Sequence, residues 1–167
     1  IAATGPKTLS LGAELCEGVL AHVGAAPEGI RAVKQSCEEG LRKRLRSTPF
    51  DLTPFLYTCV STDQQEAIRT CAPGASTVVY RAPHLAAEVG CSPDQVERLR
   101  LGDPNINDIL TEERISKLTI SGTVADCIAK IEGLTEIGID HVTLLFKGDN
   151  LDQQIDTFSR DILPRFV

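Results

Sequence analysis

One short segment of the chain has residue types and spacing that could bind an anion, the "ATGPKT" stretch near its start. Gly5 lets the backbone approach a ligand closely, and Pro6 suits the first position of a helix, where its missing N–H is not needed. The free N–H groups and the dipole of a helix start attract negative charge. Lys7 has the wrong sign for a first helical turn unless a ligand supplies negative charge there. A tight turn with a solvated lysine is the alternative interpretation. The candidate anion-binding residues are Ala3, Thr4, Gly5, Pro6, Lys7 and Thr8.

The other chemically capable side chains form no recognisable catalytic pattern. His141 begins an apolar run and His84 follows a proline, so we expect both at structural or surface positions. His22 lies late in an apolar run and could face a ligand, but no partner for it is visible in the sequence. Arg81 and Lys147 could meet an anionic substrate or simply face water. No nucleophile elbow, P-loop, zinc-protease motif or paired carboxylates are present, so the catalytic residues stay unknown.

The six cysteines have neither C-x-x-C spacing nor a paired histidine, which argues against a zinc site. Several of them occupy apolar positions of their segments. We therefore predict no metal site and expect buried, reduced thiols in a cytoplasmic protein.

Length and charge narrow the class of protein further. The 167 residues suffice for one domain but fall short of the roughly 250 that a closed α/β barrel needs. With 17 Lys and Arg against 23 Asp and Glu, the net charge of −6 gives no drive toward nucleic acid or anionic lipid. No apolar run approaches the roughly 18 residues of a membrane span, and the start does not resemble a signal peptide. The sequence predicts no nucleic-acid partner, no membrane partner and a cytoplasmic location.

Three amphipathic helices are expected to position these residues. Apolar residues recur every three or four positions over 27–45, 123–138 and 151–166. Thr123 and Asp126 form a capping-box pattern at the start of the second helix, and Gly138 ends it. Pro164 ends the third helix. Its expected buried stripe consists of Leu151, Ile155, Phe158 and Ile162.

Short apolar runs without alternation lie between the helices, at 18–24, 52–61 and 141–146. Such runs are typical of a parallel sheet covered by helices, so we predict an α/β fold in the order βαβαβ, a helical insertion, and a final βα. The insertion, 62–117, contains several prolines and leads through "LTISG" to the last strand. We expect it to consist of several helices over the carboxyl ends of the strands, where ligands bind in such folds.

Two longer segments resemble a known family. The stretch "AATGPKTLSLGAELCEGVLAHVG" resembles barrel strand five, its helix and strand six of the luciferase-like monooxygenases and their coenzyme F420-dependent relatives of the methylenetetrahydromethanopterin reductase type. "ISGTVADCIAKIEGLTEIGIDHVTLLF", followed by "FSRDILPRF", is similar to the closing segment of that family. Glu17-Gly18 stands where members often carry Asp-Gly, and everything on the first four strands is absent.

The resemblance implies a fold and a function. The fold would be the C-terminal half of a (β/α)8 TIM barrel, strands five to eight, forming a single half-barrel domain over 1–167 with strand five beginning before residue 1. The function would be that of a flavin- or deazaflavin (F420)-dependent oxidoreductase or monooxygenase. The cofactor would be coenzyme F420 or FMN, its phosphate held by Ala3 to Thr8, and the substrate a small molecule. Alone, the chain is expected not to turn over.

Two other interpretations stay open. One is a non-catalytic half-barrel that serves as a binding or assembly module, and the other is a phosphate-handling barrel enzyme of unrelated chemistry. In every case, a half-barrel leaves open edges at 1–4 and 141–146. It also leaves "HVTLLF" and the inner residues of "FLYTCV" in water. We therefore predict either a homo-oligomer or pairing with a separate N-terminal half-barrel.

Overall fold

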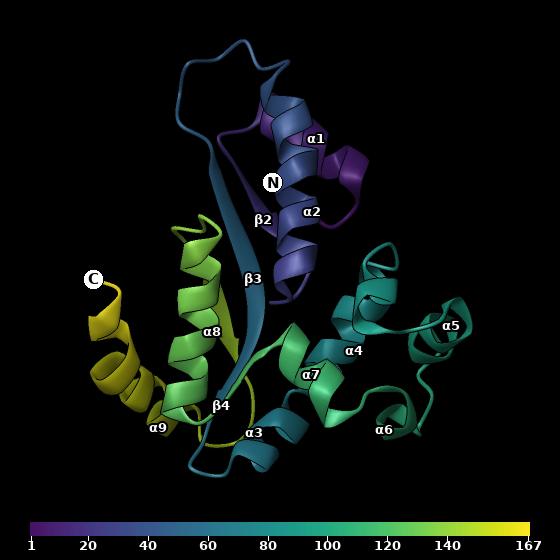
Figure 1. The fold of residues 1–167 in the computed structure, drawn as a ribbon, viewed down its shortest axis with the longest axis vertical. Helices are drawn as coiled ribbons and strands as arrows, with labels where there is room; N and C mark the ends of the chain where they lie inside the picture. Colours follow the sequence, from purple (N-terminus) through teal and green to yellow (C-terminus); the bar gives the residue numbers. More distant parts are fainter.

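The structure, a computed structural model, describes all residues from 1 to 167. Figure 1 shows strands in the centre, flanked by helices, with the helices of the insertion gathered at one end. The strands are β1 (Ala2–Ala3), β2 (Gly18–Ala21), β3 (Asp51–Val60), β4 (Ile120–Gly122) and β5 (Thr143–Phe146). The helices are α1 (Pro6–Leu15), α2 (Pro27–Leu41), α3 (Gln64–Thr70), α4 (Ala72–Arg81), α5 (Pro93–Arg100), α6 (Ile106–Ile109), α7 (Glu112–Leu118), α8 (Val124–Glu136) and α9 (Leu151–Thr157). A 3-10 turn covers Ala86–Val89, and α9 continues as a π turn, Phe158–Ile162, and a 3-10 turn, Leu163–Arg165.

All strand pairs are parallel, which confirms the predicted α/β class. The order is β1-β2-β3-β4, and β5 also pairs with β3. Thr58 of β3 pairs with Ile120 of β4 and with Phe146 of β5, so these two strands lie on opposite sides of β3. The sheet therefore has five strands rather than the four expected. "LTISG" and "HVTLLF" form separate strands, and the insertion precedes β4 instead of the last strand.

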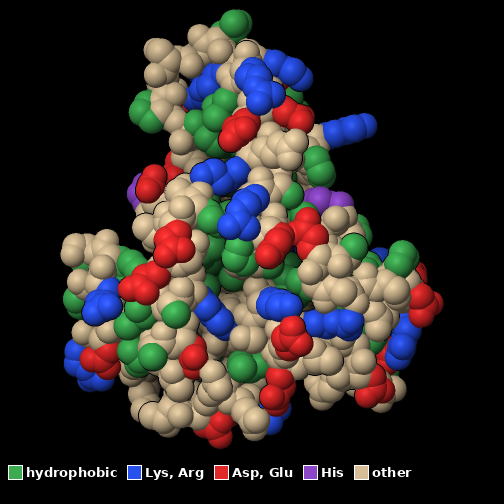
Figure 2. Space-filling model, in the orientation of Figure 1, with side chains coloured by type: hydrophobic (Ala, Val, Ile, Leu, Met, Phe, Trp, Pro, Cys, Tyr) green, Lys and Arg blue, Asp and Glu red, His purple; other side chains and the backbone are tan.

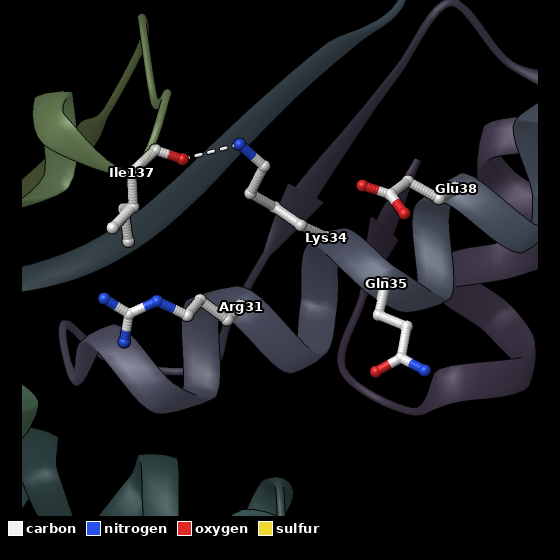
Figure 3. A pocket seen from close by; sticks show the side chains of 5 residues that line it. All are labelled: Arg31, Lys34, Gln35, Glu38 and Ile137. Carbon is white, nitrogen blue, oxygen red and sulfur yellow. Dashed lines mark hydrogen bonds between the residues drawn. The ribbon is translucent and has the colours of Figure 1, made fainter.

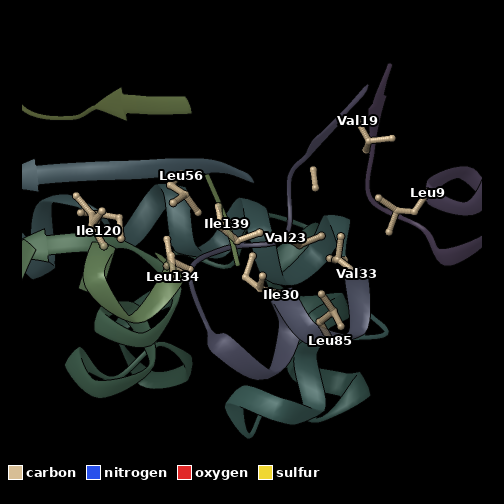
Figure 4. Packing of buried hydrophobic residues seen from close by; sticks show 14 of the residues in the cluster. Leu9, Val19, Val23, Ile30, Val33, Leu56, Leu85, Ile120, Leu134 and Ile139 are labelled. Carbon is tan, nitrogen blue, oxygen red and sulfur yellow. The ribbon is translucent and has the colours of Figure 1, made fainter. Parts of the chain in front are cut away.

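One face of the sheet packs against the helices that follow its strands. Leu56 and Val60 of β3 belong to a buried cluster of 20 residues, which includes side chains of α1, α2 and α8 (Figure 4). α2 begins at Pro27 as predicted, and α8 begins with the expected capping box, in which Thr123 and Asp126 bond each other's backbone N–H. Local start signals and apolar periodicity thus account for the main helical layer.

The opposite face of β3 packs against the insertion. Tyr57 and Cys59 alternate with Leu56 and Val60, so they point to the other side, into a second buried cluster of 18 residues built mostly from α3 to α7. We call the face bearing Phe55, Tyr57 and Cys59 the insertion face. The expectation that the inner residues of "FLYTCV" would lie in water is wrong for Tyr57 and Cys59, because the insertion covers both.

The stripe predicted for the last helix is only partly buried. Ile162 is fully buried, but Leu151 and Ile155 are 43% and 46% exposed. Gln154 occupies the buried position of α9 instead. Leu145 of β5, 39% exposed, pairs with Tyr57 and so points to the same face of the sheet as Tyr57, whereas Phe146 packs against Phe158 on the opposite face.

The surface is mixed in charge. Figure 2 shows acidic and basic side chains interspersed over the face seen there, without a large area of one sign. None of the helices combines the length and apolar character that crossing a membrane requires.

Candidate functional site

The "ATGPKT" segment connects β1 to α1 and ends in an uncapped helix start. Gly5 is the N-cap residue, Pro6 follows it, and neither a side-chain cap nor an acidic residue occupies the first turn. The backbone N–H of Leu9 bonds the carbonyl of Gly5 at 2.9 Å, but those of Lys7 and Thr8 have no partner within the protein. Two free donors thus lie at the positive end of a ten-residue helix, whose second residue is the exposed Lys7. This geometry suits an anion, and the assignment of these residues stays a prediction.

A cluster of three rings lies on the insertion face, just past the point where the pairing of β2 with β3 ends. His22 packs edge-on against Phe55 and Tyr57, with ring centroids 5.3 and 5.5 Å apart, and the two aromatic rings are 5.8 Å from each other. The Lys147 ammonium lies 5.8 Å from the centre of the Tyr57 ring, a cation–π distance. Strand pairing therefore brings residues from three distant segments into one cluster.

His22 carries an unsatisfied polar atom in this cluster. Its Nε2 is buried and has no hydrogen-bond partner. Burial, with a smaller contribution from the positive charge of Arg81, lowers the pKa of His22, so the neutral imidazole is favoured. A buried nitrogen without a partner is rare in proteins and is often associated with function. The sequence placed His22 late in a strand but did not reveal its aromatic neighbours, because these come from another strand.

The remaining candidates are separate from this cluster. The Nδ1 atom of His141 lies 2.9 Å from Oδ1 of Asp51 near the amino-terminal ends of β5 and β3, as expected for a structural residue. His84 is exposed. All six cysteines are free thiols, and five are buried. Burial raises the pKa of Cys37 to about 11 and the pKa values of Cys71 and Cys127 to about 12; we call these three the buried thiols.

A cavity of about 670 Å³ lies at the carboxyl ends of β3, β4 and β5. Its wall includes residues that follow each strand, among them Ser61, Thr123 and Gly148. The register separates it from the "ATGPKT" segment, because the end of β1 lies level with Pro54 of β3 and the end of β4 with Val60. Six residues of extended strand correspond to about 20 Å.

Gln154 fixes one wall of this cavity. β5 ends level with Thr58, so the N–H of Val60 has no strand partner on that side. The side-chain oxygen of Gln154 accepts from this N–H at 3.1 Å, and its Nε2 donates to the carbonyl of Lys147 at 2.7 Å. The only signal for Gln154 in the sequence is a polar residue within the apolar stretch of a helix, which does not by itself indicate a function.

A smaller hollow of about 310 Å³ lies between α2 and the end of α8 (Figure 3). Lys34 crosses it and donates to the carbonyl of Ile137 at 2.5 Å, which neutralises the negative end of α8. The hollow is part of the outer helical layer, away from the strand ends. We interpret it as a structural contact between two helices.

The chain resembles known proteins over nearly its whole length. Residues 1–141 match the model of the luciferase-like monooxygenase family. The chain is 28% identical to 5,10-methylenetetrahydromethanopterin reductase of Archaeoglobus fulgidus, covering 99% of this chain and 53% of that protein. The enzyme of the same name from Methanolobus tindarius is 27% identical, with 96% and 52% covered. The chain thus spans about half the length of these relatives.

Solved structures share the fold. The coenzyme F420-dependent tetrahydromethanopterin reductase from Methanopyrus kandleri superposes with a TM-score of 0.82 at 20% identity, over 99% of this chain and 50% of that one. An F420-dependent secondary alcohol dehydrogenase gives 0.69 at 19% identity, over 99% and 48%. The α/β architecture with a parallel sheet is therefore that of the luciferase-like barrel proteins.

Proposed function

The chain belongs to the luciferase-like monooxygenase family, and from this premise we propose that it is the C-terminal half of a flavin- or F420-dependent oxidoreductase. In this proposal β1, β2, β3 and β5 correspond to barrel strands five to eight, and residues 1–167 form one half-barrel domain. The cofactor is F420 or FMN. The solved structure that is named as a coenzyme F420-dependent reductase supports this choice of cofactor, and the share of the relatives' length that the chain spans supports the half-barrel.

The observation that carries the proposal is the pair of unpartnered backbone N–H groups at Lys7 and Thr8. They lie at the uncapped start of α1, next to a glycine whose Cβ position is open, with no atom within 4 Å. A phosphate group fits there without displacing a side chain, since donors and dipole are already oriented toward it. Lys7 adds charge at the same helix end.

The ring system of the cofactor would lie beside the half-buried part of the ring cluster. His22 and Phe55 supply aromatic surface there, whereas Tyr57 is buried under the insertion, and Nε2 of His22 lacks a partner that a polar ring atom would provide. When bound, a flavin or deazaflavin supplies the hydride chemistry. The protein side chains orient the ring, and neutral His22 offers one hydrogen bond. The substrate is a small molecule that binds beside the insertion.

Phosphate titration followed by NMR tests the loop. Inorganic phosphate should shift the amide signals of Gly5, Lys7 and Thr8, and Lys7→Ala should weaken binding by about two- to fivefold, the value of one charge at a helix end. Lys43→Ala, which removes another exposed lysine, serves as the control. Shifts confined to other amides would show that the loop is not the site.

Cofactor binding separates the leading proposal from a non-catalytic module. The fluorescence of FMN or F420 should be quenched or shifted when the cofactor binds. Riboflavin, which lacks the phosphate, should bind more weakly. If neither cofactor binds although phosphate does, the chain is better described as a phosphate-handling or assembly module.

We further propose that the edge formed by β5 and α9 contacts a separate N-terminal half-barrel or a second copy of the chain. Leu145 is exposed on β5, Leu151 and Ile155 are exposed on α9, and the outer edge of β5 is unpaired, which favours association. Sedimentation equilibrium at micromolar concentration should therefore show a species heavier than 18.0 kDa. A stable monomer with a cooperative melt would contradict this arrangement.

A further inference from the structure

The cavity at the ends of β3, β4 and β5 has walls whose chemistry differs from that of the cluster on the insertion face. Of its 15 lining residues only four are hydrophobic, and none is aromatic, lysine or arginine. A planar ring would find no stacking partner in it, and an anion would find no cation. The side chains of the cavity therefore offer no stacking partner to the ring of a flavin-type cofactor and no cation to its phosphate.

The wall offers many uncharged hydrogen-bonding groups. Asn150, Gln153 and Thr157 line the cavity on the α9 side and form no side-chain hydrogen bond elsewhere in the protein. Ser61 and Thr62 line it on the β3 side. Hydroxyl and amide groups both donate and accept, which matches the paired donor and acceptor of each ligand hydroxyl.

Two carboxylates complete the wall and set its charge preference. Glu66 and Asp149 line the cavity, and Glu66 already accepts a hydrogen bond from the Ser61 hydroxyl at 3.3 Å. At the start of α8 the Asp126 carboxylate accepts from the Thr123 N–H at 2.8 Å and adds a third negative charge next to the free N–H groups of Val124 and Ala125. Carboxylates accept hydrogen bonds from hydroxyl groups and repel anions.

From these walls we propose that the cavity is a second binding site, for an uncharged polyhydroxylated ligand such as a sugar or sugar alcohol. The site is independent of the proposed cofactor phosphate, since about 20 Å of strand separates the two. Its volume of about 670 Å³ falls within the range of about 300–1,000 Å³ seen for small-molecule pockets.

Three six-carbon probes that differ mainly in charge, sorbitol, gluconate and glucosamine, test the proposal by NMR titration of the full chain. Sorbitol should give saturable shifts confined to the amides of 61–62, 123–125 and 148–150. Gluconate, which adds a carboxylate, should bind more weakly than sorbitol, and Glu66→Gln should reduce that difference.

A pair of variants on one helix supplies the matched control. Ala125 and Ala129 are both exposed on α8, but only Ala125 lines the cavity. Ala125→Phe should fill it and weaken sorbitol binding by about tenfold or more, whereas Ala129→Phe should leave binding unchanged.

Three results would overturn the assignment. Sorbitol shifts that fail to saturate, or that Ala125→Phe does not diminish, would show that the cavity does not bind polyols. Tenfold tighter binding of glucosamine than of sorbitol, lost in Glu66→Gln, would make it a site for an amine. Because the phosphate titration reports on different amides, its outcome does not affect this test.

Discussion

Replacing Gln154 with leucine should destabilise the fold strongly, although the two side chains are similar in size. Gln154 is 6% exposed, and its amide satisfies both the Val60 N–H and the Lys147 carbonyl. Leucine leaves both backbone groups without a partner where β5 has already ended. Each buried unsatisfied group costs about 1–3 kcal/mol, so the variant should lose about 2–6 kcal/mol. That is a large share of the 5–15 kcal/mol typical of a whole domain.

Urea unfolding followed by circular dichroism measures this loss. Gln153→Leu is the matched control, because Gln153 is the exposed neighbour on the same helix and makes no internal hydrogen bond; its effect should stay within about 0.5 kcal/mol. Hydrogen exchange gives a local readout, since the Val60 amide should exchange faster in Gln154→Leu. A loss below about 0.5 kcal/mol with unchanged exchange at Val60 would refute the reasoning.

Two further predictions concern stability. The buried thiols keep their protons in the folded state up to pH 11–12 but lose them near pH 9.0 when unfolded. The stabilisation that these thiols contribute is therefore fully present below pH 9 and should fall by about 4 kcal/mol in total at pH 10. Lys130 partly offsets this loss, because burial lowers its pKa. Urea unfolding from pH 8 to 10 that shows no loss would contradict this prediction. Gly74→Ala should lower the midpoint of thermal unfolding, because the added Cβ would lie 2.4 Å from the Tyr57 ring. Gly133→Ala should raise that midpoint, because Gly133 lies inside α8 with open space around it.

Local signals in the sequence were sufficient for most of the elements. The proline at 27 and the Thr123–Asp126 box mark helix starts that the structure retains, since capping depends on neighbouring residues only. The continuous apolar runs likewise predicted parallel strands. The last helix was harder, because its burial depends on what covers it. Leu151 and Ile155 fit an apolar stripe, yet no element packs over them.

The candidate site could be predicted only in part. The "ATGPKT" segment was recognisable because glycine, proline and lysine act locally at one helix start. The cluster of His22, Phe55 and Tyr57 was not, because it depends on which strands pair and in which register. The burial of Tyr57 by the insertion was missed for the same reason: the sequence gives no indication of which face the insertion covers.

Because β3 divides the interior into two clusters, the insertion can be exchanged separately from the rest of the fold, both in evolution and in the laboratory. The 20-residue and 18-residue clusters lie on opposite faces of this one strand, and the sheet contributes to the second chiefly through Tyr57 and Cys59. Replacing the insertion with one of different sequence would need to preserve that seam, the contacts of Ala82 and Leu85 with the first cluster, and the bonds from Lys130 to Ser116 and from Ala25 to Leu118. Insertions grafted from relatives, or selected from libraries, could thus be exchanged on a constant scaffold.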